Sequence, residues 1–224
     1  MASALRHFKS LRVRASLAGA LLAVPQLLLA APRETVVLLH GLNRTHRAMA
    51  KLESVLRAEG YAVINCDYPS RSADIETLAA RLFAALEPQL AEAPRVHFVT
   101  HSMGGLLLRA HLQRHALPNL GRVVMLGPPN RGSEVVDRLG ALALFRWING
   151  PAGGQLGTGA SGLPAQLKDP DFELGVIAGD RSVNPLLSLL IPGRDDGKVA
   201  VERTRVAGLR DFVCLHVTHP FMAR

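Results

Sequence analysis

Aromatic side chains are scarce in this sequence: ten of its 224 residues, or 4%, are Phe, Trp or Tyr. So few stacking side chains argue against a groove that binds nucleic acid. Only 20% of the residues are charged and 48% are hydrophobic, which excludes a disordered tail or a coiled coil. The 20 Gly and 14 Pro residues follow no triplet period, which excludes a collagen-like chain. The composition therefore indicates a globular protein, with one α/β domain and a short extra segment.

Acidic residues are absent before Glu34, although the whole chain has a net charge of +8. Residues 1–14 are basic, and residues 15–31 read ASLAGALLAVPQLLLAA. A basic segment followed by a short apolar one is typical of a secretory signal peptide, so we expect an exported protein, periplasmic or secreted. Because the cleavage site after Ala31 is weak, the alternative is an uncleaved N-terminal membrane anchor, although these 17 residues are shorter than the roughly 20 that span a bilayer.

Short apolar runs alternate with helical periods along the rest of the chain. The runs are rich in Val and Ile and predict strands at 35–40, 61–66, 95–100, 122–127, 174–179 and 211–217. Helices are predicted at 45–59, 74–91, 103–116 and 133–148. This alternation predicts a mostly parallel sheet of about six strands with helices on both faces. The glycine-rich residues 149–173 are expected to form a long flexible loop.

The predicted strand at 95–100 leads directly into T-H-S-M-G-G at 100–105, which opens the next predicted helix. A strand, a sharp turn and a helix form the setting of a nucleophile elbow, with Ser102 exposed at the end of the sheet. Strand and helix approach closely there, so small residues are needed two positions to either side of the serine. Gly104 satisfies one side, and Thr100 replaces the usual first glycine. The alternative is a serine that only caps the helix.

A serine nucleophile needs an imidazole to take its proton, and we expect the chain order Ser…Asp…His. His111 and His115 lie on the helix after Ser102 and cannot turn back to it. They are spaced like a metal-binding pair, but no Glu accompanies them, so we expect solvated side chains. His216 lies within the last predicted strand, where alternation would bury it, whereas His219 follows that strand on a loop. His219 is therefore the predicted base.

The carboxylate that orients the imidazole should follow the penultimate strand. The candidates are Asp196, then Asp195, then Asp180. The turn R-D-D-G-K-V at 194–199 favours Asp196, because it presents a carboxylate 23 residues before His219. Asp-Gly is also a plain turn signal, so the sequence leaves the choice of acid open.

Four motifs in order resemble those of α/β-hydrolases: H-G-L-N at 40–43, T-H-S-M-G-G at 100–105, D-D-G-K-V at 195–199 and T-H-P-F at 218–221. The nearest resemblance is to small bacterial lipases and esterases and to the GPI inositol-deacylase-like serine esterases. It spans residues 34–221. It implies an α/β-hydrolase domain over 32–224, with a short lid or cap at 133–173.

The resemblance also implies a role for each site residue. Ser102 would be the nucleophile, Asp196 the acid and His219 the base, and the backbone N–H groups of Leu42 and Met103 would form the oxyanion hole. No metal ion and no organic cofactor is implied.

The strand order that this family implies also bears on the only two cysteines. It places Cys66 and Cys214 on opposite edge strands, about 24 Å apart at about 4.8 Å per strand. A disulfide tolerates at most about 7 Å between Cα atoms, so both thiols are expected to be free.

These observations predict a serine hydrolase that cleaves carboxylic esters, of acyl or lipid type by analogy, through an acyl-Ser102 intermediate. Phe145 and Trp147, on the predicted helix at 133–148, are expected to flank the acyl pocket or else to belong to the core. The alternatives are an acyltransferase with the same triad, or a non-catalytic, membrane-tethered binding module on this fold. The expected partner is an acyl-ester or lipid substrate, and no nucleic acid is expected to bind. Any association with a membrane is expected to occur through residues 15–31.

Overall fold

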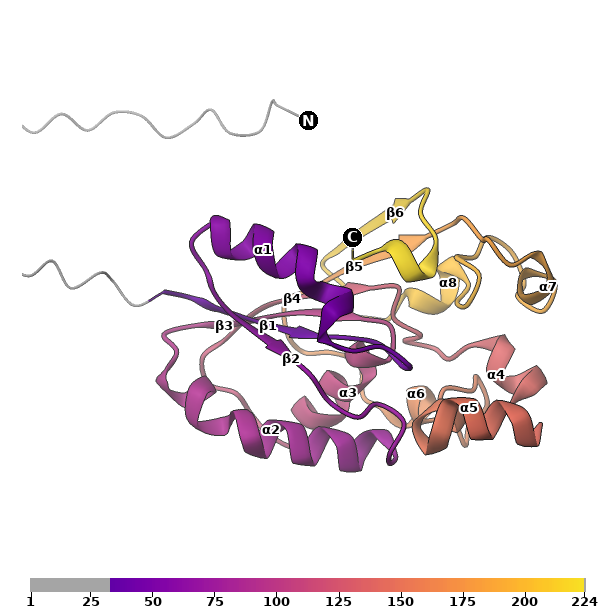
Figure 1. Cartoon of the computed structure of the whole chain (residues 1–224), viewed down its shortest axis with the longest axis horizontal. Helices are drawn as coiled ribbons and strands as arrows, with labels where there is room; N and C mark the ends of the chain where they lie inside the picture. Colours follow the sequence, from indigo (N-terminus) through magenta and orange to yellow (C-terminus); the bar gives the residue numbers. More distant parts are fainter. Residues whose placement is uncertain (1–32, 224) are drawn as a thin grey trace, which may run out of the picture. The chain divides into compact units, whose positions relative to one another are not determined.

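The computed structural model describes residues 33–223, and these form a six-stranded parallel sheet with the strand order β2-β1-β3-β4-β5-β6 (Figure 1). The predicted leader at 1–31 lies outside the described residues. The strands are β1 (Thr35–Leu39), β2 (Ala62–Cys66), β3 (Val96–His101), β4 (Leu120–Leu126), β5 (Leu174–Gly179) and β6 (Asp211–Leu215). Each predicted strand is present, and the parallel α/β architecture is confirmed.

Helices and helical turns lie between the strands. They are η1 (His46–Met49), α1 (Ala50–Ala58), α2 (Ile75–Glu92), α3 (Met103–Leu112), α4 (Glu134–Leu139), α5 (Ala143–Gly154), α6 (Leu163–Gln166), α7 (Pro185–Ser188), α8 (Val201–Thr204) and η2 (His219–Phe221). No helix within residues 33–223 has the length and hydropathy needed to cross a bilayer.

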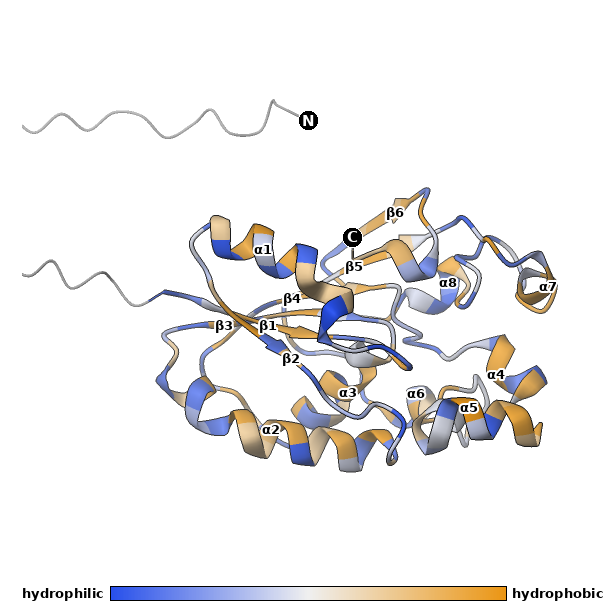
Figure 2. Ribbon diagram, in the orientation of Figure 1, coloured by the Kyte–Doolittle hydropathy of each residue, from blue (hydrophilic) through white to orange (hydrophobic). Residues whose placement is uncertain are grey.

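Both faces of the sheet are covered, which explains why the strands read as continuous apolar runs. Every residue of β1 is buried. Val37 and Leu39 face the cluster that includes α2 and α3, whereas Val36 and Leu38 face η1 and α1. In Figure 1, α1 lies above the sheet and α2 and α3 lie below it, and Figure 2 shows the central strands as mainly hydrophobic.

The edges of the sheet carry the two cysteines. Cys66 ends β2 and Cys214 lies in β6, and both thiols are free. Four strands separate them, as the resemblance implied.

Two expectations for residues 133–173 are wrong. The single helix predicted at 133–148 is interrupted at Gly140, where the chain turns and separates α4 from α5. The expected flexible loop contains the end of α5 and all of α6. The many glycines in this segment suggested a loop. One of them, Gly150, instead forms a kink within α5, and its φ of 64° favours glycine over other residues.

The close approach of α3 to β1 depends on Gly104. A Cβ atom at this position would lie 2.7 Å from the carbonyl oxygen of Leu39 and 2.8 Å from that of His40. Neither backbone oxygen is able to move without displacing the first strand from its place in the sheet.

We therefore expect Gly104→Ala to lower the free energy of unfolding by about 1–3 kcal/mol through overpacking. Urea denaturation followed by circular dichroism measures this change. Gly154→Ala in α5 is the matched control, because no atom lies within 4 Å of the added Cβ. Equal stability of the two variants would contradict the close packing of α3 on β1.

Candidate active site

Ser102 lies in a strained turn between β3 and α3. Its φ of 53° and ψ of −124° are unusual for a residue with a side chain. The turn is held by two backbone hydrogen bonds: Ser102 N–H donates to the carbonyl of Leu126 (2.8 Å), and Gly105 N–H donates to the carbonyl of Ser102 (3.0 Å). The strand–turn–helix setting predicted for this serine is therefore present.

The unusual threonine before the elbow is accommodated by a second glycine. Thr100 is fully buried, and a Cβ atom at Gly105 would lie 3.2 Å from its Oγ1. Because position 105 has no side chain, the larger residue at position 100 fits where most elbows carry glycine.

The C-terminal turn η2 brings an imidazole to the elbow. The Ser102 hydroxyl lies 2.9 Å from Nε2 of His219, and Nδ1 of His219 lies 2.7 Å from Oδ2 of Asp196. A carboxylate only accepts hydrogen bonds, so Nδ1 donates to it and Nε2 is left to accept from the hydroxyl. The imidazole and the carboxylate are buried, at 4% and 1% exposed. The structure thus brings together the three side chains that the sequence nominated from distant positions.

The backbone of the 194–199 turn fixes the Asp196 carboxylate. Oδ1 accepts hydrogen bonds from the N–H groups of Lys198 (3.0 Å) and Val199 (2.9 Å), which leaves Oδ2 for His219. The backbone carbonyl of Asp196 also accepts from the N–H of His219 (3.0 Å). The carboxylate and the imidazole are therefore joined through both side chain and main chain.

The two other acid candidates have different partners. Asp195 Oδ1 accepts from the hydroxyl of Ser188 (2.8 Å) and from the N–H of Gly197 (2.7 Å). Asp180 pairs with Arg194 and with His216. His216 was expected to be buried in the last strand, but β6 ends at Leu215 and the His216 side chain is exposed.

Gly127 provides the space in which the carboxylate meets the imidazole. Its φ is 52°, and a Cβ atom would lie 3.1 Å from Oδ2 of Asp196 and 3.2 Å from Nδ1 of His219. The sequence analysis assigned this glycine no part in the site.

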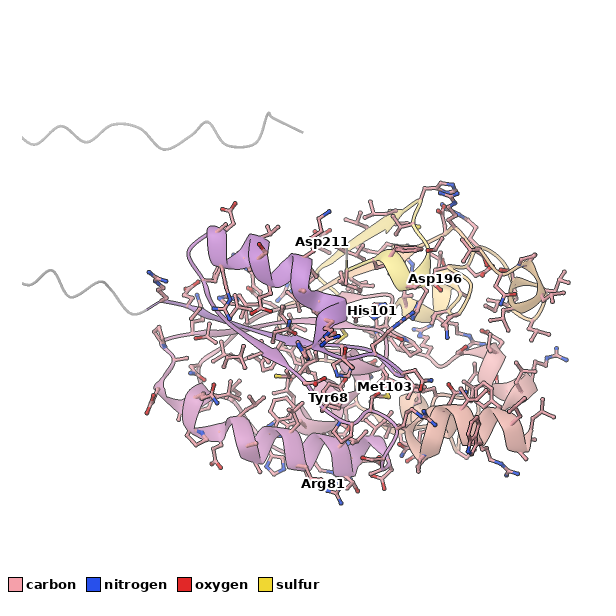
Figure 3. The ribbon with its side chains drawn as sticks, in the orientation of Figure 1. Tyr68, Arg81, His101, Met103, Asp196 and Asp211 are labelled. Carbon is pink, nitrogen blue, oxygen red and sulfur yellow. The ribbon has the colours of Figure 1, made fainter. Side chains whose placement is uncertain are left out.

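His101 is a buried neighbour that the sequence interpretation missed. Its Nε2 donates a hydrogen bond to the carbonyl of His219 (2.9 Å), and the two rings lie 4.9 Å apart. Burial, followed by the charge on His219, lowers the pKa of His101 to about 3. His101 is therefore neutral at physiological pH and ties η2 to the end of β3. The only signal in the sequence was its place directly before Ser102. In Figure 3, Asp196 and His101 lie near the C-terminal segment that carries His219.

The H-G-L-N loop after β1 is braced by an aromatic stack. The His40 and Tyr68 rings are 4.1 Å apart, the Tyr68 hydroxyl donates to the carbonyl of His40, and burial lowers the pKa of His40. Met103 begins α3, so its N–H has no acceptor within the helix. Within residues 33–223 neither Met103 N–H nor Leu42 N–H has a hydrogen-bond acceptor. Both are therefore available to an oxyanion.

A pocket of about 410 Å³ opens beside Ser102 and His219. The segment expected to be a lid supplies one wall through α4 and α5. Its apolar lining includes Leu42, Val136, Leu139, Phe145, Ile148 and Leu156.

Of the two aromatic residues predicted to flank the pocket, only Phe145 lines it. Trp147 is 75% exposed and was assigned wrongly. Residues two positions apart on a helix point in different directions, so the two side chains cannot both face one pocket.

The histidine pair on α3 also differs from its expected state. His111 stacks on Phe83 with ring centroids 3.7 Å apart, and on His115 at 4.8 Å, so the pair is not simply solvated. Within the described residues no group of three His, Cys, Asp or Glu side chains is arranged to hold a metal ion.

Comparison with known proteins identifies the class. The model of the alpha/beta hydrolase family matches residues 36–220, and the chain belongs to this family. No curated protein sequence matches the chain significantly.

Several solved structures share the fold. A lipase from Bacillus licheniformis in its mature form aligns with a TM-score of 0.67 at 21% identity, over 86% of this chain and 87% of the lipase. A metagenomic carboxyl esterase aligns with a TM-score of 0.61 at 18% identity, over 85% of this chain and 65% of the esterase. A phospholipase from Legionella pneumophila aligns with a TM-score of 0.59 at 20% identity, over 77% of this chain but only 45% of the phospholipase. At these identities the similarity shows the fold alone.

The low pKa of His101 makes stability depend on pH. An ordinary histidine, as in the unfolded chain, has a pKa of 6.5, whereas the folded value is about 3. Between these values the unfolded chain binds the additional proton, so stability falls as the pH drops below about 6.5. We expect His101 to contribute a loss of up to about 1.4 kcal/mol per pH unit in this range.

Urea denaturation at pH 7 and pH 5 measures this loss. His101→Gln keeps an N–H donor but has no titrating ring, so its stability should change less between the two pH values than that of the wild type. The slope of the variant should not reach zero, because burial also lowers the pKa of His40 and of His111. An identical pH dependence in wild type and variant would contradict a neutral, buried His101.

Proposed function

We propose that this chain is a serine hydrolase that cleaves carboxylic esters through an acyl-Ser102 intermediate. One observation carries the proposal: the Ser102 hydroxyl, the His219 imidazole and the Asp196 carboxylate form a continuous hydrogen-bonded series beside a mainly apolar pocket. This arrangement is the one by which an imidazole activates a hydroxyl that is otherwise a weak nucleophile.

In the first half of the reaction, Oγ of Ser102 attacks the carbonyl carbon of the ester while Nε2 of His219 takes the hydroxyl proton. Asp196 stays ionised and stabilises the imidazolium that forms. The carbonyl oxygen gains negative charge, and the free N–H groups of Leu42 and Met103 are the donors that we assign to it. Each donor of this kind is typically worth about 3–4 kcal/mol in the transition state.

Collapse of this intermediate breaks the bond to the alcohol, which leaves with the proton held by His219. In the second half, a water molecule gives a proton to Nε2 of His219 and attacks the acyl carbon. The carboxylic acid is then released and the hydroxyl of Ser102 is restored. The apolar wall formed by Val136, Leu139 and Phe145 suits the acyl chain, which favours an acyl or lipid ester.

An acyltransferase would use the same acyl-Ser102 intermediate but pass the acyl group to an alcohol instead of water. Product partition in the presence of an added alcohol distinguishes the two activities.

The basic and apolar segments at 1–14 and 15–31 favour an exported enzyme. If residues 15–31 are retained, we propose that they associate the enzyme with the membrane. N-terminal sequencing of the mature protein would reveal whether residues 1–31 are present.

The nucleophile is tested with a fluorophosphonate probe and with nitrophenyl esters of increasing acyl length. We expect the probe to label the wild-type protein and not Ser102→Ala. Loss of the hydroxyl should lower kcat by about 10⁶-fold, because removal of a triad serine abolishes the covalent route. Ser54→Ala is the control, since Ser54 is exposed on α1, on the opposite side of the sheet from α3.

Two results would contradict the proposal. A folded wild-type protein that neither reacts with the probe nor hydrolyses any of the esters would favour the non-catalytic binding module. Equal labelling of the wild type and of Ser102→Ala would place the nucleophile elsewhere.

A further inference from the structure

The pocket beside Ser102 has a mainly apolar lining that includes two cationic side chains and no acid. Arg44 and Lys198 line it, and none of its lining residues is Asp or Glu. Within residues 33–223 neither cation forms an ion pair.

Hydrogen bonds of the main chain hold the two segments that carry these cations beside the reacting groups. Lys198 donates its backbone N–H to Oδ1 of Asp196, and its carbonyl accepts from the hydroxyl of Ser133 (2.7 Å). Arg44 follows Leu42 by two residues, in the loop that supplies one of the oxyanion N–H groups, and its N–H donates to the carbonyl of Gly41 (3.3 Å). Both cations line the same pocket as Ser102 and His219, so an anion bound by them would lie in the pocket that receives the ester.

The two positive charges are close enough to influence each other. Desolvation by the pocket lowers the pKa of Lys198, and the charge of Arg44 lowers it further, against the opposing effect of Asp196. Like charges held together in a partly desolvated site repel, and a bound anion relieves that repulsion.

A second cavity indicates on which side of the ester the anion lies. An open groove of about 660 Å³ meets the pocket at Asn43 and Arg44 and is also lined by Arg71. Its only acid, Asp67, already interacts with His46 and His40. The pocket between α4 and α5 suits the acyl chain, so the groove lined by Arg44 and Arg71 is left for the alcohol part.

We propose that the natural substrate is an acyl ester whose alcohol part carries an anionic group, a phosphate or a carboxylate, held between Arg44 and Lys198. The inference rests on the proposed ester hydrolysis and narrows its substrate class. Arg presents a planar fork of donors to either anion, whereas Lys acts as a point charge, and the two together suit a group with several acceptor oxygens.

The test compares butanoate esters of phenols that differ only in the para substituent. 4-Carbamoylphenyl butanoate is neutral, 4-carboxyphenyl butanoate is its anionic counterpart of similar shape, and 4-phosphonophenyl butanoate carries the phosphate-like group. The measured quantity is the ratio of kcat/KM for each anionic ester to kcat/KM for the neutral ester. We expect this ratio to be at least about ten in the wild type, to be larger for the preferred anion, and to fall with added salt.

The variants attribute the ratio to the two cations. Arg44→Gln and Lys198→Gln should each lower it about tenfold, and Arg44→Lys, which keeps the charge, should retain most of it. Lys51→Gln is the matched control, because it removes a positive charge from the exposed surface of α1 and should leave the ratio unchanged.

The outcomes separate this inference from the proposed function. If the neutral ester is hydrolysed and the ratio is near one, the anion site is wrong while ester hydrolysis stands. If Arg44→Gln and Lys198→Gln slow the neutral and anionic esters equally, the cations assist the oxyanion and do not select the substrate. If no ester is hydrolysed by the folded protein, the proposed function itself is wrong.

Discussion

The contact between the Asp196 carboxylate and the His219 imidazole is the interaction on which the rest of the site depends. Both groups are buried, and a buried carboxylate is unfavourable unless donors surround it. Two backbone N–H groups satisfy Oδ1 and the imidazole satisfies Oδ2, so the carboxylate has one orientation. That orientation determines which imidazole nitrogen carries the proton, and hence which one faces Ser102. The Ser102 hydroxyl, otherwise a weak nucleophile, becomes a candidate nucleophile because of this arrangement.

The parallel sheet explains how residues so distant in the chain meet. All six strands end at the same edge, and the segments that follow β3, β5 and β6 carry the serine, the carboxylate and the imidazole. Open α/β sheets place ligands at this carboxyl edge. The proposed anion site lies at the same edge of the sheet, because Arg44 follows β1 and Lys198 follows Asp196 by two residues. The chemistry and the charge that we propose to select the substrate therefore share a few short loops.

Sequence periodicity was sufficient for the sheet but not for the details of the site. Ser102 could be nominated because the strand–turn–helix pattern is local, and β5 is found at its predicted residues, 174–179. The choice between Asp195 and Asp196 could not be made locally, since both precede Gly197 and only the fold decides which carboxylate meets His219. Trp147 was misplaced because residues two apart on one helix point in different directions, and the glycines around the kink at Gly150 were taken to indicate a loop. His101 carried no pattern of its own, as its role depends on η2 packing against β3.

The choice of acid offers the most direct measurement of the central claim. Steady-state kinetics on a nitrophenyl ester should be compared for Asp196→Asn and Asp195→Asn, two variants that make the same chemical change at adjacent positions. The account predicts that Asp196→Asn lowers kcat by about 10⁴-fold while the protein stays folded, because the imidazole loses the partner that fixes its tautomer. It predicts that Asp195→Asn keeps kcat within about tenfold of the wild type, since that carboxylate contacts Ser188 and Gly197 and not the imidazole. Equal effects of the two substitutions, or a greater loss at position 195, would contradict it.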